Sequence, residues 1–189
     1  MAKHKLEVTY GLDASEILDA IVARFRLKTA IEGAVAEVHM AREIAKLVGK
    51  EIERFEDHDL DGQPDFSIWL PSRSIPLRAE CKTVRNSDEA YRQGGEIVAY
   101  KVETQKTRAS QGDPTSRFYG VDQFEILGVC LGTKTANWSQ FLFIRADDLQ
   151  RHSKYPNKLA VMQRVPLPES GNLLPWYSNL GQLIKDKYL

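Results

Sequence analysis

The sequence has little cysteine and no long apolar run. Only two of its 189 residues are cysteines, Cys81 and Cys130, and neither stands in a paired or zinc-ligand spacing. A disulfide framework and a zinc knuckle are therefore excluded, and we expect a reducing, cytoplasmic environment. No apolar segment approaches the length of a membrane span, and residues 1–5 lack the apolar stretch of a signal peptide. We therefore expect no membrane partner.

Several common catalytic patterns are also missing. The sequence contains no glycine-rich phosphate loop and no nucleophile elbow, which argues against the commonest nucleotide-binding and serine-hydrolase classes. The four histidines show no spacing that suggests a ligand set, so we interpret them as structural or solvated; they are His4, His39, His58 and His152.

The charges balance over the whole chain but not along it. The 26 Lys and Arg residues match 26 Asp and Glu residues, which argues against a generally basic nucleic-acid coat. Residues 1–62 hold 9 basic and 13 acidic residues (9 − 13 = −4), and residues 63–189 hold 17 and 13 (17 − 13 = +4). The positive excess falls in the part of the chain that also holds a polar motif at residues 64–82.

No internal repeat or linker-like tract divides the chain, so its length predicts one domain. Capping boxes at Asp13 and at Thr29 predict two helices, the second over residues 30–48. Residues 96–108 fit a strand or a helix, and we favour the strand. Elsewhere apolar patterns predict strands at residues 51–55, 65–70, 75–84, 124–131, 140–144 and 159–165, and a closing helix at 178–187. The predicted class is α/β, with a mixed central sheet flanked by helices.

Two acidic residues and a lysine fall on neighbouring predicted strands. Asp65 follows Pro64, and the segment Glu80-Cys81-Lys82 begins fifteen positions later (80 − 65 = 15). If the strands are antiparallel neighbours, Asp65 and Glu80 lie side by side, and the alternation places Lys82 on the same face as Glu80. Carboxylate oxygens suit Mg²⁺ or Mn²⁺, and a lysine beside such a metal can hold the attacking water and offset charge that develops on a phosphate.

This arrangement resembles the PD-(D/E)XK nuclease superfamily, which includes many restriction endonucleases, Holliday-junction resolvases and Mrr-like proteins. The resemblance covers about residues 30–131 and implies a restriction-endonuclease-like αβββαβ core, with residues 132–189 as a C-terminal elaboration of a single nuclease domain. It implies that Asp65 and Glu80 bind the metal, that the Cys81 backbone carbonyl adds a ligand, and that Lys82 orients the nucleophile.

A glutamate from the preceding helix often joins the site in that family. We choose Glu37 for this role over Glu32, because Glu32 is assigned to the capping box at Thr29. The chain departs from the family pattern after the lysine strand, where a helix is usual but residues 96–108 resemble a strand.

A polar segment downstream of the motif is a candidate DNA-contact surface. Its cations can contact phosphates, and its glutamine or an arginine can read base edges. The residues are Lys101, Gln105, Lys106, Arg108 and Arg117. An ordinary solvated loop is the alternative interpretation.

The sequence thus predicts a Mg²⁺-dependent DNA endonuclease resembling type II restriction endonucleases, with Mn²⁺ as a substitute cofactor. DNA is the expected partner, a homodimer would suit cleavage of both strands, and a restriction enzyme would have a cognate methyltransferase. The alternatives are a structure-specific nuclease such as a Holliday-junction resolvase, and a non-catalytic nucleic-acid-binding or assembly module on the same fold.

Overall fold

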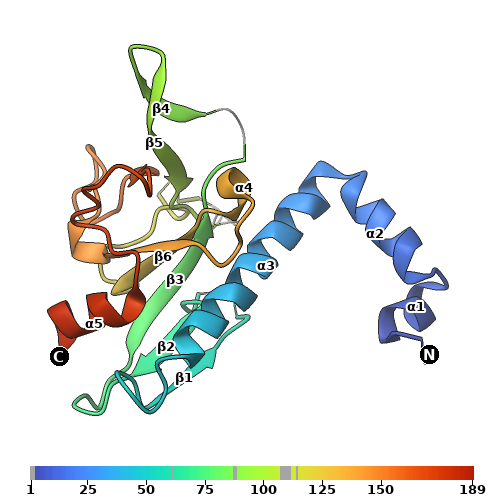
Figure 1. Cartoon of the computed structure of the whole chain (residues 1–189), viewed down its shortest axis with the longest axis horizontal. Coiled ribbons are helices and arrows are strands. Elements are labelled where there is room, and N and C mark those ends of the chain that lie inside the picture. Colours follow the sequence, from blue (N-terminus) through green and yellow to red (C-terminus); the bar gives the residue numbers. More distant parts are fainter. Residues whose placement is uncertain (1–2, 61, 87–88, 107–111, 114) are drawn as a thin grey trace.

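A five-stranded mixed sheet forms the centre of the molecule (Figure 1). The computed structural model describes residues 3–60, 62–86, 89–106, 112–113 and 115–189. The strands lie in the order β1-β2-β3-β6-β7; β3 and β6 are parallel, and the other neighbouring pairs are antiparallel. Their bounds are Arg54–Asp57, Phe66–Trp69, Leu77–Thr83, Ile126–Cys130 and Phe141–Arg145. The predicted α/β class with a mixed central sheet is confirmed.

The strands at the middle of the central sheet are buried on both faces, whereas the edge strand β1 is mostly exposed. All five residues of β6 are buried, which is typical of a parallel strand covered from two sides. Two helices, α3 (Phe25–Ala45) and α5 (Leu180–Tyr188), pack on one face. Gly128 lets α3 lie close to β6, because a Cβ at this position would lie 2.7 Å from the Met40 sulfur. A larger residue at position 128 would therefore require the Met40 side chain to move.

A second, three-stranded antiparallel sheet contributes to the core on the other side. Its order is β4-β5-β8, with bounds Ala90–Gln93, Glu96–Glu103 and Met162–Pro166. The β4-β5 hairpin lies in the chain between β3 and β6, where the αβββαβ expectation places a helix. The described part of that connection, residues 84–86, 89–106, 112–113 and 115–125, contains no helix. Gly94 and Gly95, both with positive φ, make the tight turn that favours the hairpin.

The preference for a strand over residues 96–108 is confirmed for Glu96–Glu103. Arg108 lies outside the described residues. The remaining short elements are α4 (Gly132–Thr135) and a 3₁₀ turn at Ala146–Asp148. Among the described residues, no helix combines the length and the apolar character that crossing a bilayer requires.

The first two helices extend away from the body of the molecule (Figure 1). They are α1 (Lys5–Tyr10) and α2 (Ala14–Val22), and neither contains a buried residue. The capping box predicted at Asp13 is confirmed, because the Asp13 side chain accepts the Glu16 N–H and the Glu16 carboxylate accepts the Asp13 N–H. The capping box thus determines where α2 begins, but it does not determine whether the helix packs on the core.

The predicted helix start at Thr29 is wrong. Helix α3 begins earlier, at Phe25, and the Thr29 hydroxyl donates to the Phe25 carbonyl at 3.0 Å, as in a helix interior. Glu32 is therefore not a capping residue. Its carboxylate instead lies 3.9 Å from the Lys28 ammonium and accepts a hydrogen bond from the Asn86 amide at 3.2 Å.

Candidate active site

The register of β2 and β3 brings the first two predicted site residues together. Phe66 lies opposite Ala79 in this antiparallel pair, so the next position outward places Asp65 beside Glu80. The Cys81 N–H donates to Asp65 Oδ2 at 2.7 Å, which ties the carboxylate to the neighbouring strand. The pairing that the alternation predicted is present in the fold.

Lys82 reaches back along β3 to the same site. Its Nζ donates to Glu80 Oε1 at 2.5 Å and to the Cys81 carbonyl at 3.0 Å. The Glu80 side chain is only 5% exposed and that of Lys82 is 23% exposed, so the pair is largely removed from water. The predicted sharing of one face by Glu80 and Lys82 is confirmed.

Tyr119 is a site residue that sequence reasoning missed. Its hydroxyl donates to Glu80 Oε1, the oxygen that Lys82 also contacts, and the Lys82 ammonium lies 5.5 Å from the centre of its ring. Tyr119 is 39 positions from Glu80 in a segment without regular structure, so no local pattern marks it. Burial raises its pKa, which keeps the hydroxyl protonated and able to donate.

Glu37 faces the same cluster from α3. Partial burial raises the pKa of its carboxyl, the charges of Glu80, Asp59 and Asp57 raise it further, and Lys82 opposes them. The side chain still keeps an exposed surface, so the carboxyl lies at the edge of the cluster rather than inside it. The structure therefore brings together Glu37, Asp65, Glu80 and Lys82, as the sequence predicted.

The cluster holds more carboxyl groups than cations. Burial and the nearby charge of Glu80 raise the pKa of Asp65 to about 7, although Lys82 and the Cys81 N–H lower it. Burial alone would lower the pKa of Lys82, but Glu80 and its other anionic neighbours outweigh that effect and raise it. Lys82 thus stays charged, and one ammonium faces three carboxylates.

A pocket of about 550 Å³ opens beside Asp65 and Glu37. Its polar lining also includes Asp57, His58 and Asp59, from the end of β1 and the turn that follows it. The His58 Nε2 lies 2.9 Å from the Ser67 hydroxyl oxygen, so the ring is held at the pocket wall. His58, interpreted from the sequence as structural or solvated, thus lies next to the carboxylates.

The donor set fits a hydrated divalent cation better than a closed metal site. Within the described part of the chain, no three Asp, Glu, His or Cys side chains already form a metal-binding group. Asp65, Glu80 and the Cys81 carbonyl could supply oxygen ligands, and Mg²⁺ keeps several waters in addition to such ligands. Burial raises the pKa of the Cys81 thiol, which disfavours a thiolate ligand, so its carbonyl is the atom that suits this role.

The predicted DNA-contact residues fall into two places. The Lys106 ammonium lies 5.8 Å from the centre of the Tyr119 ring, and the Lys106 carbonyl accepts a hydrogen bond from Arg117 Nε at 3.1 Å. Gln105 forms a β-bridge with Phe118, next to Tyr119. Lys101 lies apart, 5.3 Å from the ring centre of Tyr91 on the β4-β5 hairpin. Arg108 lies outside the described residues, so Lys106, Gln105 and Arg117 form the group nearest the carboxylates.

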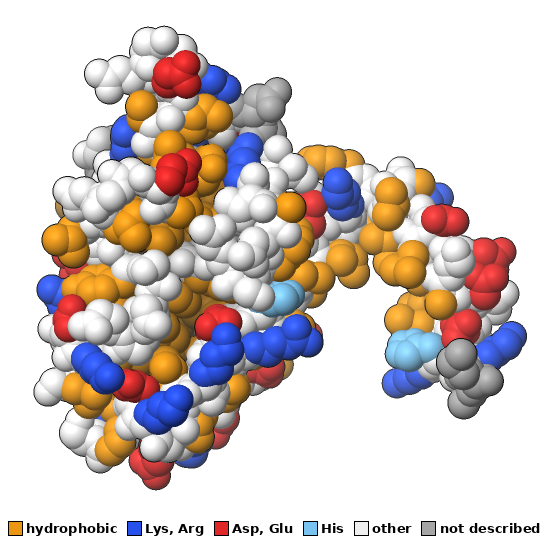
Figure 2. Space-filling view, in the orientation of Figure 1, with side chains coloured by type: hydrophobic (Ala, Val, Ile, Leu, Met, Phe, Trp, Pro, Cys, Tyr) orange, Lys and Arg blue, Asp and Glu red, His pale blue; other side chains and the backbone are white. Residues whose placement is uncertain are grey.

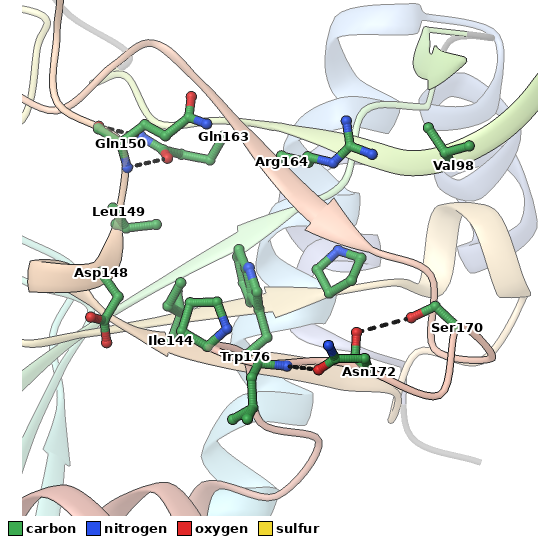
Figure 3. A pocket seen from close by; sticks show the side chains of 13 residues that line it. Val98, Ile144, Asp148, Leu149, Gln150, Gln163, Arg164, Ser170, Asn172 and Trp176 are labelled. Atoms are coloured by element: carbon green, nitrogen blue, oxygen red, sulfur yellow. Dashed lines mark hydrogen bonds between the residues drawn. The ribbon is translucent and has the colours of Figure 1, made fainter. Parts of the chain in front are cut away.

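A second pocket, of about 380 Å³, is lined by other residues (Figure 3). None of the four clustered residues lines it. Two of its lining residues are joined by a pair of hydrogen bonds. The Gln150 backbone N–H donates to Gln163 Oε1 at 2.9 Å, and Gln163 Nε2 donates to the Gln150 backbone carbonyl at 3.0 Å. These groups stabilise the connection before β8.

The fold is similar to that of a solved bacterial homing endonuclease. The two chains share 13% sequence identity and a TM-score of 0.48, and the similarity covers 76% of this chain and 82% of that chain. No protein family and no curated protein sequence matches this chain. A likeness of this degree carries no inference about activity, so the functional inference depends on the side chains of the cluster.

Proposed function

We propose that this chain is a Mg²⁺-dependent endonuclease that hydrolyses phosphodiester bonds in DNA. The observation that supports it most is the meeting of Asp65, Glu80 and Lys82 at the paired ends of β2 and β3. The excess of carboxylates over cations there favours a bound divalent cation, and the protonated lysine favours an anionic substrate.

Asp65, Glu80 and the Cys81 carbonyl would hold the cation, and Mn²⁺ would serve as a substitute. When bound, the cation would polarise the scissile phosphate and make a water more acidic. Tyr119 and Lys82 both contact Glu80 Oε1 and so fix the direction of that carboxylate. Glu37 would assist from the edge of the cluster by accepting a hydrogen bond from a water.

Lys82 would act as a charged donor rather than as a base. Its raised pKa keeps the ammonium protonated, and its hydrogen bonds to Glu80 and the Cys81 carbonyl direct Nζ into the site. A fixed ammonium there would orient the attacking water and offset the negative charge that develops on the phosphate. The neighbouring Lys106 and Arg117 would neutralise flanking phosphates, and Gln105 would contact a base edge.

We propose double-stranded DNA as the substrate, cut as by type II restriction endonucleases, with a cognate methyltransferase protecting the same sites. A resolvase-like enzyme would instead prefer branched DNA, and a binding module would not cut any substrate. These alternatives differ in a single assay.

The test incubates the purified protein and Mg²⁺ with supercoiled plasmid, single-stranded DNA and a four-way junction. We expect plasmid cleavage that chelator stops and Mn²⁺ restores. We also expect Asp65→Ala and Lys82→Ala to lower the single-turnover rate by roughly 100-fold or more, while DNA affinity measured with Ca²⁺ changes little. DNA binding without cleavage at any Mg²⁺ or Mn²⁺ concentration, or full activity in Asp65→Ala, would contradict the proposal.

A further inference from the structure

Exposed apolar side chains are concentrated at the N-terminal end of the chain. Among the described residues, ten of the sixteen large apolar side chains that are exposed belong to residues 6–38, and six belong to residues 39–189. The ten are Leu6, Val8, Tyr10, Leu12, Leu18, Val22, Phe25, Leu27, Ile31 and Val38. Figure 2 shows apolar side chains along the projecting N-terminal arm, defined here as residues 3–24.

The arm lacks the means to stabilise its own helices. Helix α1 has six residues and α2 has nine, and isolated helices shorter than about 12–15 residues are marginal in water. Neither helix buries a residue in the monomer. Since most helical stability comes from packing an apolar face, the arm requires a surface to pack against.

Helix α3, which every copy of this chain carries, offers an apolar surface that could receive the arm. An apolar groove of about 320 Å³ runs along α3, lined by Ile31, Ala34, Val35, Val38, His39 and Arg42. In the single chain, the arm diverges from α3 after a turn at residues 23–24 (Figure 1). No residue of the arm lines this groove. An arm from a second molecule can reach it.

Charge and area both favour a second copy as the occupant. Residues 3–22 carry two lysines and four acidic residues (2 − 4 = −2), whereas residues 24–42 carry four basic and two acidic residues (4 − 2 = +2). Eight of the ten side chains lie on the arm or in the groove. If each exposes on the order of 100 Å², two arms meeting two grooves would bury about 1,600 Å² in total, which is the area of a stable interface.

We propose that two copies of this chain form a two-fold symmetric dimer in which the arm of each copy packs into the α3 groove of the other. Such an exchange is self-complementary and closes after two subunits. The interface involves α1, α2 and one face of α3. Its groove adjoins the pocket beside Asp65 and Glu37, because Ala34, Val38 and Arg42 line both.

Sedimentation of the full chain tests the dimer. The wild type should sediment as 43.0 kDa, twice the 21.5 kDa of one chain. Val22→Glu and Leu18→Glu on the arm should sediment as monomers. Ile75→Glu is the matched control, because Ile75 and Val22 are both 71% exposed, and this variant should remain a dimer. Since the arm residues are exposed in the single chain, the circular dichroism of the body should stay unchanged.

A mixing experiment tests which surfaces meet. Val22→Glu alone and Val38→Lys alone should each be monomeric, because each homodimer would place two charges against apolar side chains. Mixed together, they should form a heterodimer, in which the arm glutamate meets the groove lysine on one side and the unmodified surfaces meet on the other. A wild type that stays monomeric up to on the order of 100 µM, a Val22→Glu variant that stays dimeric, or a mixture that stays monomeric would each overturn the proposal.

Discussion

Strand β3 holds an acid–base pair at each end, and the two pairs differ in how their charges are balanced. At one end, Arg78 donates three hydrogen bonds to Glu125, one from its backbone N–H and two from its guanidinium, so both carboxylate oxygens are used. At the other end, Lys82 contacts Glu80, but Asp65 and Glu37 add two more carboxylates. The Arg78–Glu125 pair uses all of its carboxylate oxygens within the fold, whereas the cluster around Lys82 holds more carboxyl groups than its one ammonium can pair, as our proposal of a bound cation requires.

The largest difference should appear when one carboxylate at each end is neutralised. Glu80→Gln should lower the Mg²⁺-dependent cleavage rate by roughly 100–1,000-fold, because it removes the negative charge of a proposed metal ligand and leaves Lys82 only a neutral amide oxygen to contact. Glu125→Gln should leave the rate nearly unchanged and lower the free energy of unfolding by about 1 kcal/mol, since it weakens the pair with Arg78. Single-turnover cleavage and denaturant unfolding of both variants measure this. Equal rate losses in Glu80→Gln and Glu125→Gln would contradict the assignment of only the Glu80 end of β3 to the proposed active site.

A smaller effect should follow from removing one tyrosine hydroxyl at each end. Tyr119→Phe should lower kcat about 10-fold with little change in KM for DNA, because Glu80 loses a donor that fixes its direction. Tyr188→Phe is the matched control, since the Tyr188 hydroxyl donates to the Glu125 carbonyl at 3.1 Å, and it should leave kcat unchanged. Steady-state kinetics of the two variants measure this. A higher KM with an unchanged kcat in Tyr119→Phe would contradict a role for the Tyr119 hydroxyl in positioning Glu80.

DNA binding should depend on Lys106, which lies near the carboxylate cluster, and not on Lys101, which lies on the β4-β5 hairpin. Lys106→Ala should weaken binding a few-fold across sequences and reduce the slope of log affinity against log salt by about 0.9, as expected for one lost phosphate contact. Lys101→Ala should change neither, because Lys101 lies against Tyr91 on the β4-β5 hairpin. Binding titrations with Ca²⁺ at several salt concentrations measure both slopes. Equal slope changes would extend the DNA surface to the hairpin.

The smallest effect concerns pH and stability. The folded-state pKa of Asp65 is about 7, above its ordinary value of 3.8, so ionisation of this group costs the fold stability as pH rises from about 4 through 7. Asp65→Asn cannot ionise and avoids that loss. In chelator, its Tm relative to wild type should therefore rise by about 2–4 °C between pH 5 and pH 8.

Addition of Mg²⁺ at pH 8 should reverse that order of stability. The cation should raise the Tm of the wild type and leave that of Asp65→Asn nearly unchanged, because only the wild type keeps both carboxylate ligands. Thermal melts at both pH values, with and without Mg²⁺, check the result. A Tm difference that does not depend on pH would show that Asp65 ionises as an ordinary exposed carboxyl.

Local patterns predicted the part of the site that lies on two strands. Asp65, Glu80 and Lys82 alternate with apolar residues, and a short turn joins their strands, so period and spacing together set the register. Tyr119 could not be found in this way, because it comes from an irregular segment and joins the site only through long-range packing. Patterns of period two locate residues on strands, but they do not locate the loops that fold over them.

The capping patterns in the sequence predicted that helices are present better than they predicted where those helices begin or pack. The capping box at Asp13 predicted a helix correctly, yet the apolar stripe that followed it does not pack on the body. The same type of signal at Thr29 was wrong, because the preceding residues continue the helix back to Phe25. A capping pattern reports which backbone N–H groups a side chain can satisfy, and that condition does not decide where a helix begins when the chain before it is also helical.

The glycine in β6 has a consequence for how the site tolerates change. Helix α3 carries Glu37 on the side toward the carboxylates, and the same helix touches the sheet where Gly128 has no side chain to separate them. A side chain at position 128 would meet the side chains of Met40 and Phe143 first. A substitution there would therefore act on the proposed site through Met40 and α3, without altering Glu37, Asp65, Glu80 or Lys82.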